Sequence, residues 1–182
     1  RAALDPSDGT IQISERRLLI AAGDIAGCGI EKDAETALLL DNLPGTVAAL
    51  GDNVYEDGTA QEYSNCYTPT WGRHKTRTRP TPGNHEYHAA NATPYFTYFG
   101  SAAGEAGKGY YSYNLGAWHI IVLNSNCDDM GGCTRSSAQG QWLLADLAAN
   151  PATCTLAYWH HPRFNSGALH GNDSHYQDFW QI

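Results

Sequence analysis

Four short apolar segments of this chain each end at a polar residue that can bind a metal ion or a substrate. The segments are residues 17–23, 46–50, 77–81 and 153–159, and the polar residues that follow them are Asp24, Asp52, Asn84 and His160. Segments of this length and composition are typical of buried strands. Ligands of α/β proteins gather at the carboxyl ends of parallel strands, so we expect the four polar residues to converge on one edge of a sheet. One such residue alone is usually a cap or a turn partner, but four together favour a binding site.

Helical patterns lie between these segments, and the chain length fits one core. The candidate elements are helices at residues 33–40, 59–66 and 137–149 and a hairpin of strands at 110–115 and 118–123. This alternation predicts an α/β fold with helices packed outside the sheets. A chain of 182 residues has room for a single domain, spanning residues 1–182.

Composition excludes two classes of partner. Apolar residues make up 42% of the chain, which is enough for a packed interior. The net charge of -8 argues against nucleic acid as a partner, because the overall field repels polyanions. We also expect no membrane partner, since no apolar run approaches the roughly 20 residues needed to cross a bilayer.

The five cysteines favour disulfides over a metal site. No Cys-x-x-Cys pair occurs, so a thiolate metal site or a redox motif has no support. Cys127 and Cys133 flank a Gly-Gly turn that could bring either one towards Cys154. Disulfides indicate a secreted or periplasmic protein. The alternative is a cytosolic protein with five buried thiols, because Cys often serves as a small buried hydrophobe.

Two loops carry the residue types of a dinuclear hydrolytic metal site. Such a site needs a short carboxylate that bridges two cations about 3.5 to 4 Å apart. Asp52 suits this role, because Gly51 lets the end of the strand turn without a Cβ clash. Asn84 offers an amide oxygen as a ligand, and His85 beside it can reach the substrate.

The order of these motifs resembles a known family. Asp24, then Gly51-Asp52-x-x-Tyr55, then Gly83-Asn84-His85-Glu86, then His160, are similar to the first four of the five motifs of the metallophosphoesterases. A tyrosine at the position of Tyr55 resembles the purple acid phosphatase branch. The resemblance covers about residues 18–170, and the segments 66–74 and 159–167 resemble secreted bacterial members. It implies the αββα metallophosphoesterase sandwich and the hydrolysis of small-molecule phosphomonoesters by water that two metal ions activate.

The resemblance also implies a role for each motif residue. Iron together with Zn, Mn or a second Fe would be the metal pair. The ligands would be Asp24 and Tyr55 on the first metal, Asn84 and His160 on the second, and Asp52 as the bridge.

Histidines would carry the rest of the chemistry. His85 matches a catalytic histidine near the substrate phosphate, and His170 matches a histidine that lines the substrate pocket. We also expect His161 and Asn84 to contact the substrate, although an exposed position without a role is an equal alternative for His161.

Two departures from the family pattern stand out. The first motif reads Asp24-Ile25-Ala26, where Asp-x-Gly is usual. The fifth motif, Gly-His-x-His, is absent from residues 161–182. We therefore expect the domain to be incomplete at its C-terminal end, and a further polypeptide segment to supply two histidines. The alternative is that His170 and His175 replace the missing pair.

Two other functions remain open from the sequence. One is a phosphodiesterase or nucleotidase of the same fold that uses Mn or Zn and leaves Tyr55 off the metals. The other is a non-catalytic fragment that acts in protein interaction. The basic run at residues 73–79 is either a rim that attracts phosphate or a solvated segment without a role.

Overall fold

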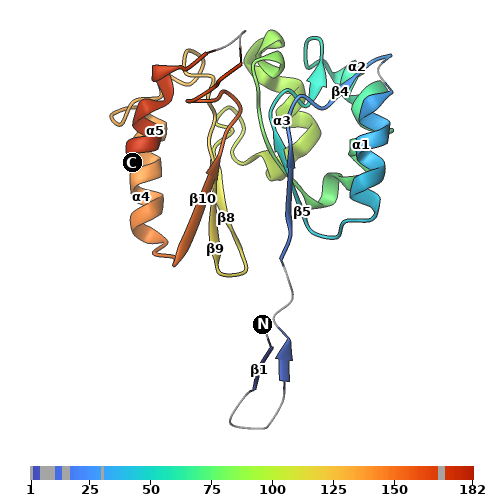
Figure 1. The fold of residues 1–182 in the computed structure, drawn as a ribbon. Helices are drawn as coiled ribbons and strands as arrows, with labels where there is room; N and C mark the ends of the chain where they lie inside the picture. The colour runs from blue at the N-terminus through green and yellow to red at the C-terminus, as the bar shows by residue number, and fades with distance from the viewer. Residues whose placement is uncertain (1, 5–10, 14–16, 30, 168–170) are drawn as a thin grey trace.

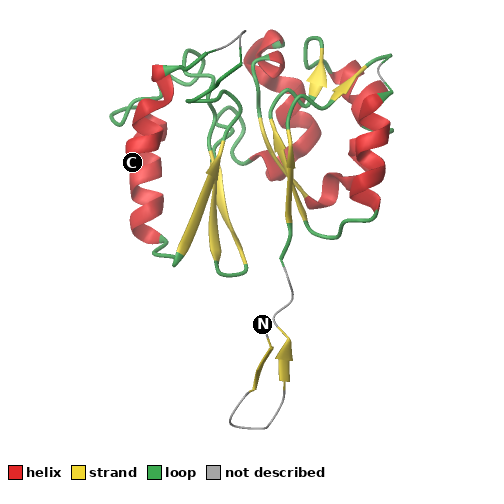
Figure 2. Cartoon of the chain, in the orientation of Figure 1, coloured by secondary structure: helices red, strands yellow, loops and turns green. Residues whose placement is uncertain are grey.

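A computed structural model describes residues 2–4, 11–13, 17–29, 31–167 and 171–182. Two three-stranded sheets lie next to each other at the centre of the molecule, and helices cover their outer sides (Figure 1). Strands and helices are both abundant, and they alternate along the chain (Figure 2). Mixed helix and strand with parallel sheets agrees with the expected α/β class.

The first sheet contains three of the four expected strands. Its order is β3 (Leu19–Ala22), β5 (Thr46–Leu50) and β7 (Thr78–Thr81), and all three run parallel. Side chains on both faces of β5 are fully buried, as its central place requires. The carboxyl ends of the three strands therefore meet at one edge.

The second sheet combines the expected hairpin with the fourth strand. Its order is β10 (Cys154–Tyr158), β9 (Trp118–Val122) and β8 (Tyr111–Leu115). Strand β9 runs antiparallel to β8 and parallel to β10, with Tyr158 opposite Val122. Two small pairs complete the strands: β1 (Ala2–Leu4) with β2 (Ile11–Ile13), and β4 (Ala26–Gly27) with β6 (Val54–Tyr55).

Two of the α-helices begin at a side-chain cap. The α-helices are α1 (Lys32–Asp41), α2 (Ala60–Glu62), α3 (Thr93–Phe99), α4 (Ala138–Ala149) and α5 (Gln177–Gln181). The shorter turns are η1 (Tyr63–Tyr67), η2 (Trp71–Arg77), η3 (His85–His88), η4 (Ala90–Ala92), η5 (Gly100–Ala103) and η6 (Ser174–Tyr176). Ser137 caps α4 by accepting from the backbone N–H of Gly140, and Thr59 forms a capping box with Glu62. The three expected helices are confirmed, the second as α2 followed by η1.

Three apolar clusters hold these layers together. One joins the first sheet to α1, η1 and α3, and includes Val47 and Tyr67. A second lies between the two sheets and includes Ala48 and Val122. The third joins the second sheet to α4 and α5. No helix of the described residues is long and apolar enough to cross a bilayer.

Two disulfides connect four of the five cysteines. Cys28 bonds to Cys66, and Cys127 bonds to Cys133. The expected bridge to Cys154 is wrong: Cys127 and Cys133 close their own loop across the Gly-Gly turn, and Cys154 is a free thiol at the start of β10.

Candidate functional site

The four polar residues at the strand ends lie on one side of the two sheets. Asp24 follows β3, Asp52 follows β5, Asn84 follows β7 and His160 follows β10. The loops after these strands all emerge at the upper edge of the molecule (Figure 1). Shared strand direction explains the first three, because β3, β5 and β7 are parallel to one another. His160 comes from the second sheet, so the expectation that all four would lie at the edge of one sheet is wrong.

Backbone geometry brings Asp24 and Asp52 side by side. Both residues have positive φ, 55° and 47°, in the left-handed region that L-residues seldom adopt. The two loops stay paired beyond the strands, since the N–H of Asp24 donates to the carbonyl of Gly51 and the N–H of Ile25 donates to that of Asp52. A side chain on Gly51 would come within 2.6 Å of His160. Glycine there lets the strand ends approach closely.

Side chains of Asp24, Asp52, Tyr55 and His160 form a connected group, here called the strand-end cluster. The Tyr55 hydroxyl donates to Asp24 Oδ1 at 2.6 Å and to Asp52 Oδ2 at 3.1 Å. His160 Nε2 lies 3.3 Å from the same Oδ2 atom. Asp52 thus contacts both Tyr55 and His160, and Asp24 joins the group through the Tyr55 hydroxyl.

Asp52 and His160 stabilise each other's charged form within the strand-end cluster. Burial alone would favour the neutral form of Asp52, but the hydrogen bond and the positive charge of His160 outweigh it and lower the pKa of this carboxyl. Burial also works against a charged His160, and the hydrogen bond to Asp52 outweighs it and raises the pKa of this imidazole. Burial and the Asp24 hydrogen bond raise the pKa of the Tyr55 phenol. Without a cation beside it, Tyr55 therefore stays protonated and acts as a donor.

Glu86 holds the two central loops together, a role that the sequence reasoning did not assign. Its fully buried carboxylate accepts from the N–H of Asn53 at 2.8 Å, from the N–H of Gly83 at 2.7 Å and from the Tyr63 hydroxyl at 3.1 Å. Burial raises the pKa of this carboxyl. These contacts join the loop after β5 to the loop after β7. The signal was present, because Glu86 ends the Gly-Asn-His-Glu motif.

His85 faces the strand-end cluster from the loop after β7. Its backbone N–H donates to Asp52 Oδ1 at 3.0 Å, and its Nε2 lies 3.8 Å from Asp52 Oδ2. Nδ1 of the ring bonds to the carbonyl of Glu56, and the ring packs edge-on against Tyr55 at 4.4 Å between centroids. Because Nδ1 is engaged by a carbonyl, Nε2 is the atom that a substrate could contact.

Asn84 lies next to this contact, at the start of η3. The residue is half-buried, and its side-chain amide has no hydrogen-bond partner within the described part of the chain. An amide oxygen without a hydrogen-bond partner suits a hard cation.

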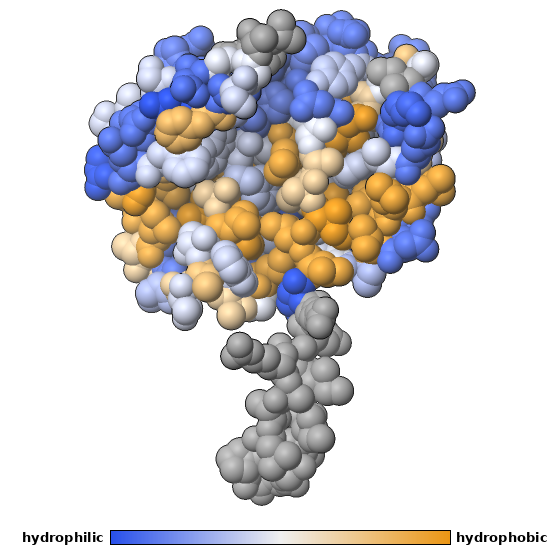
Figure 3. Space-filling view, viewed as in Figure 1, coloured by the Kyte–Doolittle hydropathy of each residue, from blue (hydrophilic) through white to orange (hydrophobic). Residues whose placement is uncertain are grey.

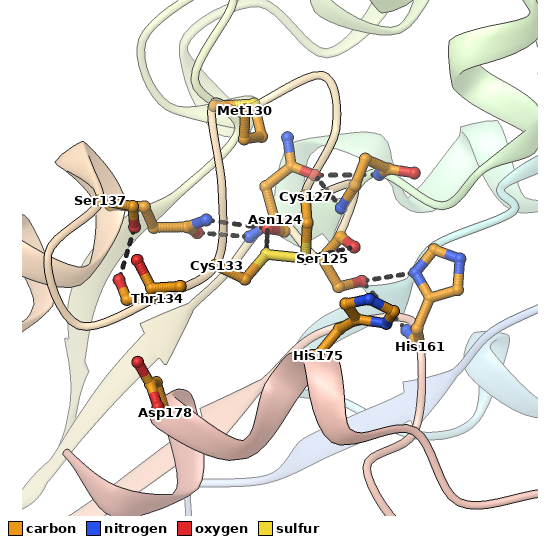
Figure 4. Close-up of a disulfide and its surroundings, with 12 residues drawn as sticks. Asn124, Ser125, Cys127, Met130, Cys133, Thr134, Ser137, His161, His175 and Asp178 are labelled. Carbon is orange, nitrogen blue, oxygen red and sulfur yellow. Dashed lines mark hydrogen bonds between the residues drawn. A yellow bond between two sulfur atoms is a disulfide. The ribbon is translucent and has the colours of Figure 1, made fainter.

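His161 lies beside a cavity of about 210 Å³ on the same side of the molecule. Its Nδ1 is 2.8 Å from the Ser125 hydroxyl, and its ring stacks on Tyr176 at 5.7 Å. The Cys127–Cys133 disulfide and His175 lie close by (Figure 4). His170, the other predicted substrate histidine, lies outside the described residues.

The end of β9 adds polar residues that the sequence reasoning missed. Asn124, Ser125 and Asn126 are all buried and directly follow Leu123. The Ser125 hydroxyl also accepts from the backbone N–H of His161, so it fixes the loop after β10. The same sequence pattern, an apolar segment followed by polar residues, marks the end of β9, so these residues could have been predicted.

The donor types of this site fit hard cations. Carboxylates, a phenol and an imidazole meet there, with the Asn84 amide in a neighbouring loop, and such donors bind Fe, Zn or Mn. Among the described residues, no three His, Cys, Asp or Glu side chains are arranged to hold a metal ion. Hydrogen bonds link the donors to one another instead.

Comparison with known proteins gives one distant relative. No family model matches the chain. It is 29% identical over 166 residues to purple acid phosphatase 15 of Arabidopsis thaliana. The match covers 72% of this chain, and the chain spans about 30% of the length of that relative. This similarity supports a phosphatase-like hydrolase related to the purple acid phosphatases.

Proposed function

We propose that this chain is the catalytic domain of a dinuclear metal-dependent phosphoester hydrolase of the purple acid phosphatase type, secreted as in bacterial members. The position of Asp52 carries the proposal, because one buried carboxylate contacts both Tyr55 and His160. The two outer helix layers and the two sheets would be the αββα sandwich of the metallophosphoesterases. Two disulfides favour a place outside the cytosol.

Five residues would hold the two metal ions. Asp24 and Tyr55 would bind the first ion, Asn84 and His160 the second, and Asp52 both. When bound, such ions supply Lewis acidity and lower the pKa of a coordinated water molecule. The iron-containing pair expected from the sequence remains part of the proposal.

The remaining polar residues would act on the substrate. His85 would protonate the leaving alkoxide from Nε2, because its Nδ1 is engaged by the carbonyl of Glu56. Asn84 and His161 would orient the phosphomonoester, and the Ser125 hydroxyl would keep His161 in place. We propose that His170 also takes part in catalysis at the substrate, as the resemblance implies.

A further polypeptide segment would complete the domain at β10. Among the described residues, no strand pairs with the outer edge of β10. A groove of about 440 Å³ runs beside it, and Phe164 and Trp180 next to it are 60% and 57% exposed. Apolar surface forms a band across this face of the molecule (Figure 3). Open edges with apolar surface are sites of strand pairing, so we propose that the segment adds a strand here and supplies two histidines.

Metal and mass analysis of active material tests the proposal. We expect two metal equivalents per site, hydrolysis of 4-nitrophenyl phosphate, and a further segment that denaturing gels and intact mass reveal. Active material without bound metal would contradict the dinuclear mechanism. A single 19.8 kDa chain with two tightly held metals and full turnover would contradict the further segment alone.

A further inference from the structure

Four of the five basic residues at residues 73–79 form two pairs with different surroundings, and the fifth, His74, lies 2.9 Å from Asp41. Arg73 forms an ion pair with Asp41 at 2.8 Å. Arg77 donates to the carbonyls of Leu40, Leu43 and Gly45, and so caps the end of α1. Arg73 and Arg77 are therefore engaged in contacts that stabilise the fold. Lys75 and Arg79 are the other pair.

Lys75 and Arg79 line one cavity of about 580 Å³, here called the lateral pocket. Its walls come from η2, β7, α3, η5 and β8, and they include Thr76, Ser101, Tyr111 and Tyr113. Strands β7 and β8 are edge strands of their sheets, and the Tyr111 hydroxyl joins them by donating to the carbonyl of Pro80 at 2.8 Å. Lys75 and Arg79 lie before and at the start of β7, whereas the strand-end cluster follows the carboxyl ends of the strands.

Neither cation of the lateral pocket has an acidic partner in the described ranges. Lys75 Nζ lies 4.3 Å above the ring of Tyr98, and the Arg79 guanidinium lies 5.6 Å from the ring centre of Tyr113. Aromatic faces position a cation without neutralising it. The acidic residue nearest in sequence to η5, Glu105, is already paired with Lys108.

Two uncompensated cations in one cavity are unexpected in a chain with a net charge of -8. Like charges repel, and a bound anion between them would relieve that repulsion. An arginine and a lysine together suit an oxyanion, since the guanidinium fork can donate two hydrogen bonds to it. The hydroxyls of Thr76 and Ser101 have no partner among the described side chains and offer further donors.

Aromatic walls favour an organic anion over a simple ion. The rings of Tyr111 and Tyr113 stack at 6.3 Å between centroids and line the same cavity as the two cations. Flat apolar groups pack well on such faces. The volume lies within the roughly 300 to 1,000 Å³ of small-molecule sites.

We propose that the lateral pocket binds an organic phosphate or sulfate ester, with its oxyanion at Lys75 and Arg79 and its organic part against Tyr113. This site is separate from the strand-end cluster. It does not depend on the proposed hydrolase activity.

Titration calorimetry with two probes that the proposed hydrolase would leave intact tests the site. Phenyl sulfate stands for sulfate esters and phenylphosphonate for phosphate esters, and inorganic sulfate is the comparison without a ring. We expect saturable binding of at least one phenyl probe, tighter than inorganic sulfate and weaker at high salt. The tighter phenyl probe identifies the ester class. Equal affinity for inorganic sulfate would overturn the organic-ester assignment.

Three variants locate the binding. The double variant Lys75→Met/Arg79→Met should bind the tighter probe at least about tenfold more weakly, the scale of a lost charge-assisted hydrogen bond. The control Lys32→Met/Lys108→Met removes the same charge from exposed ion pairs and should bind as the wild type does. Asp52→Asn should also retain binding. If the double variant does not fold, the single variant Lys75→Met replaces it in the binding test, because Lys75 lies in η2 and outside the sheet.

Three results would overturn the proposal. The first is that neither phenyl probe binds saturably at millimolar concentration. The second is that the control variant weakens probe binding as much as Lys75→Met/Arg79→Met does. The third is that Asp52→Asn abolishes binding while Lys75→Met/Arg79→Met retains it. The last result would assign the anion to the strand-end cluster.

Discussion

The charged side chains of the strand-end cluster have partners inside the protein, whereas the cations of the lateral pocket have no acidic partner among the described residues. In the cluster, Asp52 meets His160 and the Tyr55 hydroxyl, so each polar group has a partner inside the protein. In the lateral pocket, Lys75 and Arg79 contact aromatic rings and meet no carboxylate among the described residues. A network of mutual partners makes its members interdependent, whereas Lys75 and Arg79 share no partner with the strand-end cluster within the described part of the chain. The effects of a substitution should therefore reach the other residues of the strand-end cluster, but a substitution in the lateral pocket should affect that pocket alone.

Asp52→Asn should give the largest effect. Because Asp52 contacts both halves of the cluster, its loss should remove both metals together and abolish hydrolysis. Elemental analysis and 4-nitrophenyl phosphate turnover measure the two effects. Glu35→Gln, which breaks an exposed ion pair on α1, is the matched control and should leave both unchanged. Two full metal equivalents in Asp52→Asn would refute the bridging role.

His85→Ala should separate binding from chemistry. Metal content should stay near that of the wild type, while kcat falls by about 10² to 10⁴, the scale of a lost general acid. The loss should be smaller for 4-nitrophenyl phosphate than for an alkyl phosphate, because nitrophenolate needs little protonation to leave. Equal losses for both esters would contradict the acid role, and a loss of metal would make His85 a ligand.

Glu86→Gln should lower the free energy of unfolding. The new amide nitrogen would face the N–H of Asn53 or that of Gly83 and leave a buried donor without an acceptor, which costs about 1 to 3 kcal/mol. Urea denaturation followed by circular dichroism measures the change. Glu105→Gln, at an exposed ion pair, should shift stability by less than about 0.5 kcal/mol. An unchanged midpoint for Glu86→Gln would show that other contacts hold the two loops.

Much of the fold followed from apolar segments and their ends. Strands β3, β5, β7 and β10 lie where the segments predicted them, because buried strands need short apolar runs. The helices expected at residues 59–66 and 137–149 also form, and each begins after a capping residue, Thr59 and Ser137. The positions of Asp24, Asp52 and Asn84 at one edge followed from parallel strand direction, whereas His160 comes from the second sheet, which the segments did not separate from the first.

Contacts distant in the sequence were not predictable in this way. Glu86 reaches Asn53 across 33 residues, and nothing in the local pattern marks that pair. The Cys127–Cys133 bridge depends on how one loop folds back on itself, and spacing alone left Cys154 as a candidate. The basic run gave no hint that Arg73 and Arg77 would be engaged while Lys75 and Arg79 share a pocket, since that depends on α1 and β8.

Tyr55→Phe should have a smaller effect on turnover than His85→Ala. The phenol contacts two carboxylates and would bind the metal that gives colour, but it does not reach the substrate phosphorus in the proposed arrangement. Visible absorbance should disappear while most of the hydrolysis remains. A variant that stays coloured would assign the absorbance to another ligand. A protein without visible absorbance that turns over with Mn or Zn would favour the phosphodiesterase or nucleotidase alternative.

Lys75→Met/Arg79→Met should have the smallest effect on turnover, and it tests the comparison most directly. The two cations lie before and at the start of β7, and within the described structure neither contacts a member of the strand-end cluster. Hydrolysis of 4-nitrophenyl phosphate should therefore keep its kcat and KM, even though the lateral pocket loses its anion. Steady-state kinetics at low ionic strength is the sharpest measurement, because any long-range attraction of substrate by these cations is strongest there. A KM that rises only in this variant, and not in Lys32→Met/Lys108→Met, would show that the basic run attracts phosphate to the catalytic site, and the two regions would then act together.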